Sequence, residues 1–228
     1  IHQPHYLPWL PYLLKIEQSD VFILLDTVDF QKNGLQNRNQ IKTEQGARWL
    51  TVPVRHQLGQ KIQNVEINRD SGWRRKHWQT LQQSYRRAPA FAIYAKELDQ
   101  VYATDWHGLN ELNMTLLLML VRWMGIRTPI MRSSEMKATG VGSELVLNLC
   151  LEVGATQYIS GSGGKNYLEP HAFQRSGIEI LFQPPVLPDD YPQLHSQIGF
   201  INGLSVIDMI FNCGEAWRER LPVERITG

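Results

Sequence analysis

The feature that most constrains the fold is the apolar run VFILLD at 21–26, which ends in an acidic residue. A near-continuous run of this kind is typical of a strand buried on both faces of a sheet. The preceding residues, 11–18, have a short helical pattern that begins with Pro11, a residue suited to the first turn of a helix. With a strand at the first residues, these segments form a βαβ unit whose two strands lie side by side. The sequence therefore predicts an α/β fold.

Patterns further along the chain predict more helices and strands. The helix at 107–124 is the clearest, because its leucines recur at spacings of three and four residues and Gly125 follows it. We expect one domain over 1–228, of the α/β class, with a mixed, mostly parallel sheet, flanking helices and a helical insertion in the middle at about 69–124. The other predicted strands are 47–54, 61–68, 157–160 and 178–183, and the other helices are 73–87, 91–102, 143–153, 170–176 and 204–213.

The composition argues against several classes of protein. Lysine and arginine number 23 against 22 acidic residues, a net charge of +1, which gives no general attraction to nucleic acid or to an anionic membrane. The longest apolar run, at 116–121, is far shorter than the roughly 20 residues that span a bilayer. Cys150 and Cys213 both lie in apolar runs, which predicts buried, reduced thiols and a cytoplasmic protein, with a single disulfide as the alternative.

Candidate catalytic groups lie at the ends of the first two predicted strands. His2 is the best general base, because imidazole titrates near neutral pH; a histidine that caps the strand end and holds a loop has equal weight. Asp26 ends a buried strand, a place where functional groups gather. Tyr6 and Trp9 are candidates to stack on a sugar or a base. His2 and His5 with no nearby third ligand make a poor metal site, so we expect no metal.

Two polar loops are candidate binding segments. The loop QKNGLQNRN at 31–39 concentrates amides, which read hydroxyls, carboxylates or phosphates by directed hydrogen bonds, although a solvated hairpin explains part of the pattern. The loop GSGGK at 161–165 follows a strand and offers backbone N–H groups, serine hydroxyls and Lys165 to an anion. It lacks the P-loop glycine and hydroxyl positions, which hold Ile159 and Asn166, and an ordinary turn is the alternative.

A basic segment with aromatic residues lies at 69–87. Arginines and tryptophans interleave there, a pattern that can indicate nucleic acid. A solvated helix face with aromatic core anchors explains the same pattern. Because the net charge of the chain is only +1, we favour the second interpretation.

Several motifs in order resemble one family of bacterial proteins. They are HQPHYLPW at 2–9, SDVFILLDTVDFQKNGLQNRNQIK at 19–42, WLTVPV at 49–54, WRRKH at 73–77, GATQYISGSGGKNYL at 154–168 and LSVIDMIFNCG at 204–214. This order resembles the WbqC-like family, and the resemblance covers nearly the whole chain. It implies a context, genes of O-antigen, lipopolysaccharide and other surface-polysaccharide clusters, and a set of characteristic positions. It does not imply a particular reaction.

The resemblance and the residues together lead to one main hypothesis. We expect a cytoplasmic enzyme with a small-molecule substrate, a nucleotide-sugar, which transfers an acyl or aminoacyl group to a nucleotide-linked amino sugar; no cofactor is identified. The alternatives are a non-catalytic binding or assembly protein, and a nucleotidyltransferase-like enzyme that uses the HQPH loop at 2–5. The predicted catalytic residues are His2 and Asp26, and the predicted substrate-binding residues are Gln3, Tyr6, Trp9, Gln31, Lys32, Asn37, Arg38, Asn39, His77, Ser160, Gly161, Ser162, Lys165 and Tyr167.

Overall fold

The computed structural model describes residues 1–221 and confirms a mixed α/β class. The three helices predicted in the middle segment are present. The helices are α1 (Leu10–Glu17), α2 (Trp73–Tyr85), α3 (Phe91–Ala103), α4 (Leu109–Trp123), α5 (Ser143–Glu152), α6 (Pro170–Arg175) and α7 (Val206–Cys213). The strands are β1 (Phe22–Leu24), β2 (Arg38–Thr43), β3 (Gly46–Thr51), β4 (Val54–Arg55), β5 (Glu66–Ile67), β6 (Ile130–Arg132), β7 (Gln157–Gly161) and β8 (Glu179–Gln183).

The strands form pairs, two parallel and two antiparallel. Strand β1 pairs with β6 and β7 with β8 in parallel, while β2–β3 and β4–β5 are antiparallel. His2 forms a parallel bridge to Leu24, so the predicted βαβ unit exists in a short form. The strands are short partly because prolines interrupt them. Pro4 follows the bridge at His2, and Pro53, which has no N–H to donate, separates β3 from β4.

The predicted strand at 61–68 is mostly wrong. Residues Ile62–Asn64 form a 3₁₀ turn, and only Glu66–Ile67 is a strand. The backbone N–H of Ile62 donates to the Val28 carbonyl, and that of Gln63 donates to the Asp26 carbonyl. These bonds to the segment after β1 hold the chain in a turn, which the imperfect alternation of apolar residues did not reveal.

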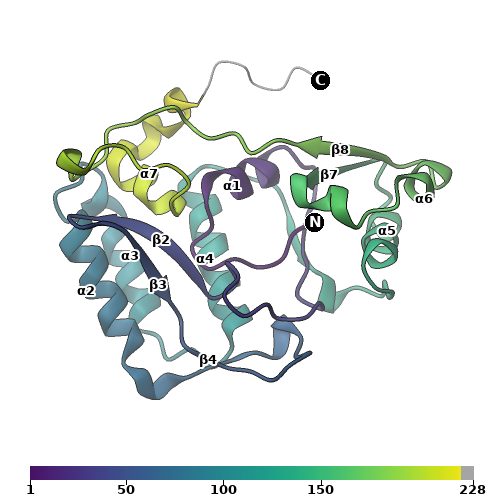
Figure 1. Ribbon diagram of the computed structural model, residues 1–228, viewed down its shortest axis with the longest axis horizontal. Helices are drawn as coiled ribbons and strands as arrows, with labels where there is room; N and C mark the ends of the chain where they lie inside the picture. The colour runs from purple at the N-terminus through teal and green to yellow at the C-terminus, as the bar shows by residue number, and fades with distance from the viewer. Residues whose placement is uncertain (222–228) are drawn as a thin grey trace.

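The larger apolar core lies among the helices of one end of the molecule. Figure 1 shows α2, α3 and α4 together with the β2–β3 hairpin at one end, and α7 above them. Leucines of α4 that face this core, Leu112, Leu116 and Leu120, have no exposed surface. Burial of each such side chain contributes about 1.5–3 kcal/mol to the stability of the fold. This end of the chain therefore supplies most of the apolar packing.

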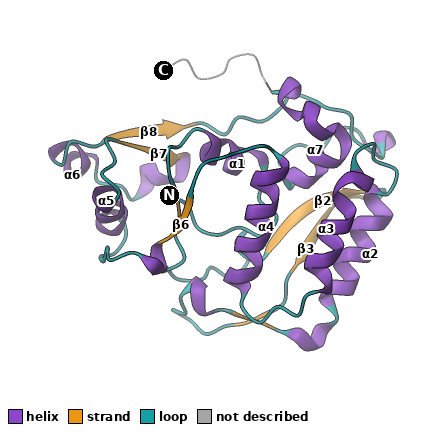
Figure 2. Cartoon of the chain, turned by 180° about the vertical axis from the view of Figure 1, so that it is seen from behind, coloured by secondary structure: helices purple, strands orange, loops and turns teal. Residues whose placement is uncertain are grey.

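A smaller apolar cluster lies at the other end, among α5, α6, β7 and β8. Its buried members include Cys150, Tyr158, Phe173 and Ile178. Figure 2 shows the same four elements grouped apart from α2–α4, with α1 lying between the two groups. Cys150 is a buried free thiol and Cys213 a half-buried one. Among residues 1–221, none of the helices is long and apolar enough to cross a bilayer.

Candidate functional site

A cavity lies where the first residues and α1 meet the end of β7. Its volume is about 240 Å³. It brings together five of the predicted site residues, His2, Gln3, Ser160, Gly161 and Tyr167, from segments about 150 positions apart. The remaining lining residues are Ile1, Lys15, Leu25, Tyr158, Gly163 and Gly164.

His2 is held at the wall of this cavity by its backbone and by its ring. Its N–H donates to the Ile23 carbonyl at 3.0 Å, and its carbonyl accepts from the N–H of Leu25 at 2.8 Å. The ring Nδ1 lies 3.1 Å from the Gln3 carbonyl. Because a carbonyl only accepts, Nδ1 carries the proton and Nε2 keeps the lone pair. The ring is thus oriented with one nitrogen available to accept a proton.

Both histidines of the opening stretch are neutral. Burial, the nearby Lys15 ammonium and His5 hold the pKa of His2 well below its usual range. Burial and Lys15 also lower the pKa of His5 to about 3. The rings of His2 and His5 meet edge to face, with centroids 4.7 Å apart. The pair therefore offers hydrogen bonds and a lone pair, but no positive charge.

Lys15 is the functional candidate that the sequence patterns missed. It lies in the last turn of α1, and only 4% of its surface is exposed. Its Nζ would lie 3.5 Å from a Cβ added at Gly161, which places the ammonium beside the end of β7. Burial lowers its pKa to about 8. The signal was present in the sequence, since Lys15 is the one charged residue in the apolar run at 10–16.

The end of β7 forms the opposite wall. Ser160 is buried, and its hydroxyl donates to the Gly161 carbonyl at 3.1 Å. A Cβ at Gly164 would overlap the Ser160 hydroxyl and lie 2.9 Å from Leu168 Cδ1, so only glycine allows this close approach. Burial raises the pKa of Tyr158 and that of Tyr167, so both phenols are uncharged at neutral pH. This wall therefore presents hydroxyls and backbone.

The amide-rich loop at 31–39 supports the cavity through hydrogen bonds to the residues around it. Gln36 donates from Nε2 to Gln3 Oε1 at 2.8 Å and accepts from the Gln31 N–H at 2.8 Å. The side-chain amides of Asn37 and Asn39 donate hydrogen bonds to the backbone carbonyls of Val52 and Leu7, respectively. These amides position the chain around the cavity without lining it, and direct contact of Asn37 and Asn39 with a substrate stays a prediction.

Asp26 lies outside the cavity in a closed set of hydrogen bonds. Its carboxylate has no exposed surface and accepts from Asn110 Nδ2 at 2.7 Å. It also accepts from the hydroxyls of Ser133 at 2.9 Å and Ser134 at 2.8 Å, and from the Ser134 N–H at 2.9 Å. Asp26 thereby joins β1 to the segment after β6. Its catalytic role stays a prediction that this geometry does not favour.

Tyr6 and His77 lie in the larger core. The Tyr6 hydroxyl is 2.9 Å from His77 Nδ1 and 2.6 Å from the hydroxyl of Tyr102. Burial lowers the pKa of His77 to about 4, so this histidine is neutral and its hydrogen bonds are internal. Their predicted contact with a substrate has no support from this arrangement.

The other predicted binding residues lie apart from the cavity. Trp9 is half-buried and bridges to Ser205, and the Arg38 guanidinium lies 4.4 Å from the centre of the Trp49 ring. Lys165 Nζ lies 5.3 Å from the centre of the Phe182 ring. Besides Tyr167 at the cavity, the exposed members of the predicted set are Gln31, Lys32, Ser162 and Lys165.

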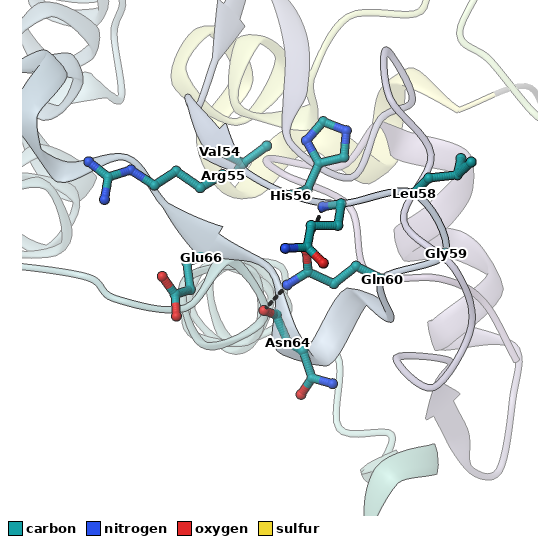
Figure 3. Close-up of a pocket in the computed structure, with 9 residues that line it drawn as sticks. Val54, Arg55, His56, Leu58, Gly59, Gln60, Asn64 and Glu66 are labelled. Carbon is teal, nitrogen blue, oxygen red and sulfur yellow. Dashed lines mark hydrogen bonds between the residues drawn. The ribbon is translucent and has the colours of Figure 1, made fainter.

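A larger hollow, of about 890 Å³, lies elsewhere on the surface. Figure 3 shows it lined by one loop after β4, whose Gln60 donates to the Asn64 carbonyl at 2.6 Å, and by side chains of β4 and β5. Arg55, at its edge, already pairs with Asp70 at 2.8 Å. This hollow contains none of the predicted site residues and only charges that are exposed. The smaller cavity is therefore the candidate functional site.

Comparisons with known proteins agree with the motifs. The model of the WbqC-like protein family matches residues 3–219. A Mycobacterium tuberculosis protein named uncharacterized protein Rv1507c is similar to this chain, with 34% identity over 217 residues that cover 94% of this chain and 93% of that protein. No solved structure matches the chain. The resemblance seen in the sequence is confirmed, and the chain belongs to the WbqC-like protein family.

Proposed function

We propose that this protein is an enzyme of O-antigen or surface-polysaccharide biosynthesis that transfers an acyl or aminoacyl group to a nucleotide-linked amino sugar. The resemblance to the family supports the biosynthetic context, and the free thiol of Cys150 agrees with a cytoplasmic site of action. The chemistry rests on one observation. His2 lines a cavity with its Nδ1 proton donated to a carbonyl and its Nε2 lone pair available.

The reaction requires a base at one step. The sugar amine attacks the acyl carbonyl carbon, the new C–N bond forms, and the bond to the leaving group breaks. Nε2 of His2 accepts the proton that the nitrogen loses and then passes it to the leaving group. Gln3 and the Ser160 hydroxyl, at the same cavity, orient the reacting groups through hydrogen bonds.

The size of the cavity limits what it holds. A volume of about 240 Å³ equals that of about eight water molecules, enough for the reacting end of a sugar derivative. The nucleotide would lie over the neighbouring surface, where Lys165 is exposed and available to its phosphates. The nucleotidyltransferase-like alternative draws less support, because neutral His2 and His5 supply no positive charge to a phosphate.

A binding and turnover experiment tests the proposal. We expect nucleotide-linked amino sugars or acyl-CoA to raise the melting temperature, and His2→Ala to lower turnover by about 100-fold or more with the fold intact. His171→Ala is the matched control, since His171 is exposed and outside the cavity. If nucleotide-sugars, ATP and acyl-CoA leave the melting temperature unchanged, the non-catalytic binding or assembly function replaces this proposal.

A further inference from the structure

The ammonium group of Lys15 is the feature of the cavity that the proposed reaction does not use. The side chain is 4% exposed, and among residues 1–221 its Nζ has no hydrogen-bond or ion-pair partner. Buried charges are ordinarily paired, because removing them from water is costly. An unpaired cation at the wall of a cavity is therefore able to take its counter-charge from a ligand.

The surroundings of Lys15 supply no such counter-charge. None of the side chains that line the cavity in the described part of the chain is acidic. Glu17, two positions further along, pairs with Arg218 at 2.6 Å. The titratable neighbours His2, His5 and Tyr158 are uncharged at neutral pH. Burial and Lys15 lower the pKa of the Ile1 amino group to about 5, and burial raises the pKa of Tyr167, so these lining groups are uncharged at neutral pH as well. Among the described residues, the lining thus carries the charge of Lys15 alone.

We propose that this cavity binds a small ligand through a carboxylate group, which lies against Lys15 Nζ. The apolar part of the ligand would pack on Leu25 and the glycines of the 161–164 segment. The inference rests on the proposed function only for the choice of the cavity. It holds equally if the protein binds its ligand without chemistry.

A carboxylate fits the charge of the site better than a phosphate does. One ammonium neutralises one carboxylate, whereas a phosphate dianion would keep a negative charge in a buried place. Phosphate sites usually gather several cationic or N–H donors, and Lys15 is the one lysine or arginine among the described residues that line the cavity. Gln3 adds neutral donors that a carboxylate accepts from, because its Oε1 accepts from Gln36 and its Nε2 N–H groups stay unused among the described residues.

Binding of an anion here would also act on His2. Lys15 is, after burial, the main cause of the lowered pKa of His2. A carboxylate beside Lys15 offsets that positive charge and so reduces the part of the lowering that Lys15 causes, while burial still lowers the pKa of His2. The imidazole would become a stronger base only in the occupied site.

The test compares two probes of the same shape and different charge. Butyrate and butyramide are titrated into the full chain, with methyl phosphate as the third probe, and binding is followed by NMR. We expect butyrate to bind at least about tenfold more tightly than butyramide, and more tightly than methyl phosphate. Lys15→Met should abolish this preference, and Lys15→Arg should keep part of it because a guanidinium also carries a positive charge. Lys96→Met, at an exposed position of α3, is the matched control.

Several outcomes would overturn the inference. They are equal binding of butyrate and butyramide, tighter binding of methyl phosphate, or an unchanged preference in Lys15→Met. If that variant fails to fold, the comparison of butyrate with butyramide on the unaltered chain still decides. A carboxylate preference without turnover on any acyl donor would support this inference and contradict the proposed function. Turnover without the preference would support the proposed function and contradict this inference.

Discussion

Two buried lysines lie in this molecule in opposite surroundings. Lys42 is 1% exposed, and its Nζ donates to Gln193 Oε1 at 3.0 Å and to the Gly199 carbonyl at 2.6 Å. Lys15 is 4% exposed and has no partner among the described residues. Both lysines lose hydration on folding, but only Lys42 regains polar contacts. The difference is the reason to propose a ligand for Lys15 and none for Lys42.

The surroundings of Lys42 are organised by Asp208 on α7. Its carboxylate accepts from Tyr85 at 2.6 Å and from Tyr191 at 2.8 Å, and its charge favours the charged form of Lys42. Burial raises the pKa of Asp208, against the effect of these hydrogen bonds. Such a closed network is costly to break at any single member. The cavity at Lys15 has no equivalent organising acid among residues 1–221.

The largest expected effect is therefore in the closed network. Asp208→Ala removes the acceptor of two tyrosine hydroxyls and the counter-charge near Lys42, and we expect a loss of about 3–5 kcal/mol in the free energy of unfolding. Urea denaturation measures this loss. Asp99→Ala, an exposed substitution on α3, should change stability by less than about 0.5 kcal/mol. A similar loss of stability in Asp208→Ala and Asp99→Ala would show that the hydrogen-bond network around Asp208 does not stabilise the fold.

Lys15→Met should increase the free energy of unfolding, in contrast to Asp208→Ala. A fall in the pKa of Lys15 from 10.5 to about 8 corresponds to about 3 kcal/mol against the charged form, so the neutral variant should be about 1–3 kcal/mol more stable at pH 7. Below pH 8 the folded and unfolded chains both hold this proton, and the cost is fully present. Between pH 8 and 10.5 the unfolded chain binds more protons, so the fold gains stability as the pH rises.

Urea denaturation across this pH window measures the effect. The stability difference between Lys15→Met and the unaltered chain should shrink steadily from pH 8 to pH 10.5. Taking the difference removes the titration of groups that both chains share. A variant less stable at pH 7 would show that Lys15 contributes to packing as Lys42 does.

The smallest effect is expected behind the cavity. Gln36→Ala removes the hydrogen bond to Gln3 and the acceptor for the Gln31 N–H, which should cost about 1–2 kcal/mol. It should also weaken butyrate binding, because Gln3 loses the hydrogen bond that positions it. Asp208→Ala should not weaken butyrate binding in this way, because Asp208 lies outside the cavity. Gln82→Ala, exposed on α2, is the control. Unchanged binding of butyrate in a destabilised Gln36→Ala would restrict this glutamine to a structural role.

Periodicity was sufficient to predict much of the fold, because it reports contacts along one element. The α4 helix, the buried β1 strand and the short helix between the first two strands follow from apolar spacing and from proline and glycine positions. The division of the strands into pairs did not follow. It depends on bonds such as those from the 62–63 segment to the residues after β1, which no local pattern encodes.

The proximity of some candidate residues could also be predicted from the sequence, while their role in binding or catalysis stays a prediction. His2 and Ser160, both at strand ends, line one cavity together with Gln3, Gly161 and Tyr167, which the resemblance to the family had singled out. Asp26 had the same signal, but its carboxylate is bound by groups more than 80 positions away, Asn110 and Ser133 among them. Whether a polar side chain is satisfied internally is decided by such distant partners, and a single sequence does not show them.

The two walls of the cavity come from segments that pack in different apolar clusters. Lys15 comes from α1, whose neighbouring Leu14 and Ile16 belong to the larger core, while Tyr158 belongs to the smaller cluster and Ser160 lies on the same strand. Gln183 of β8 donates to Gln18, just after α1, at 2.7 Å and ties the two walls together. The cavity therefore forms only when both parts of the molecule have folded and packed together. If only the larger core had packed, Lys15 would be in place, but Tyr158 and Ser160 on the opposite wall would not be, and the cavity would not be enclosed.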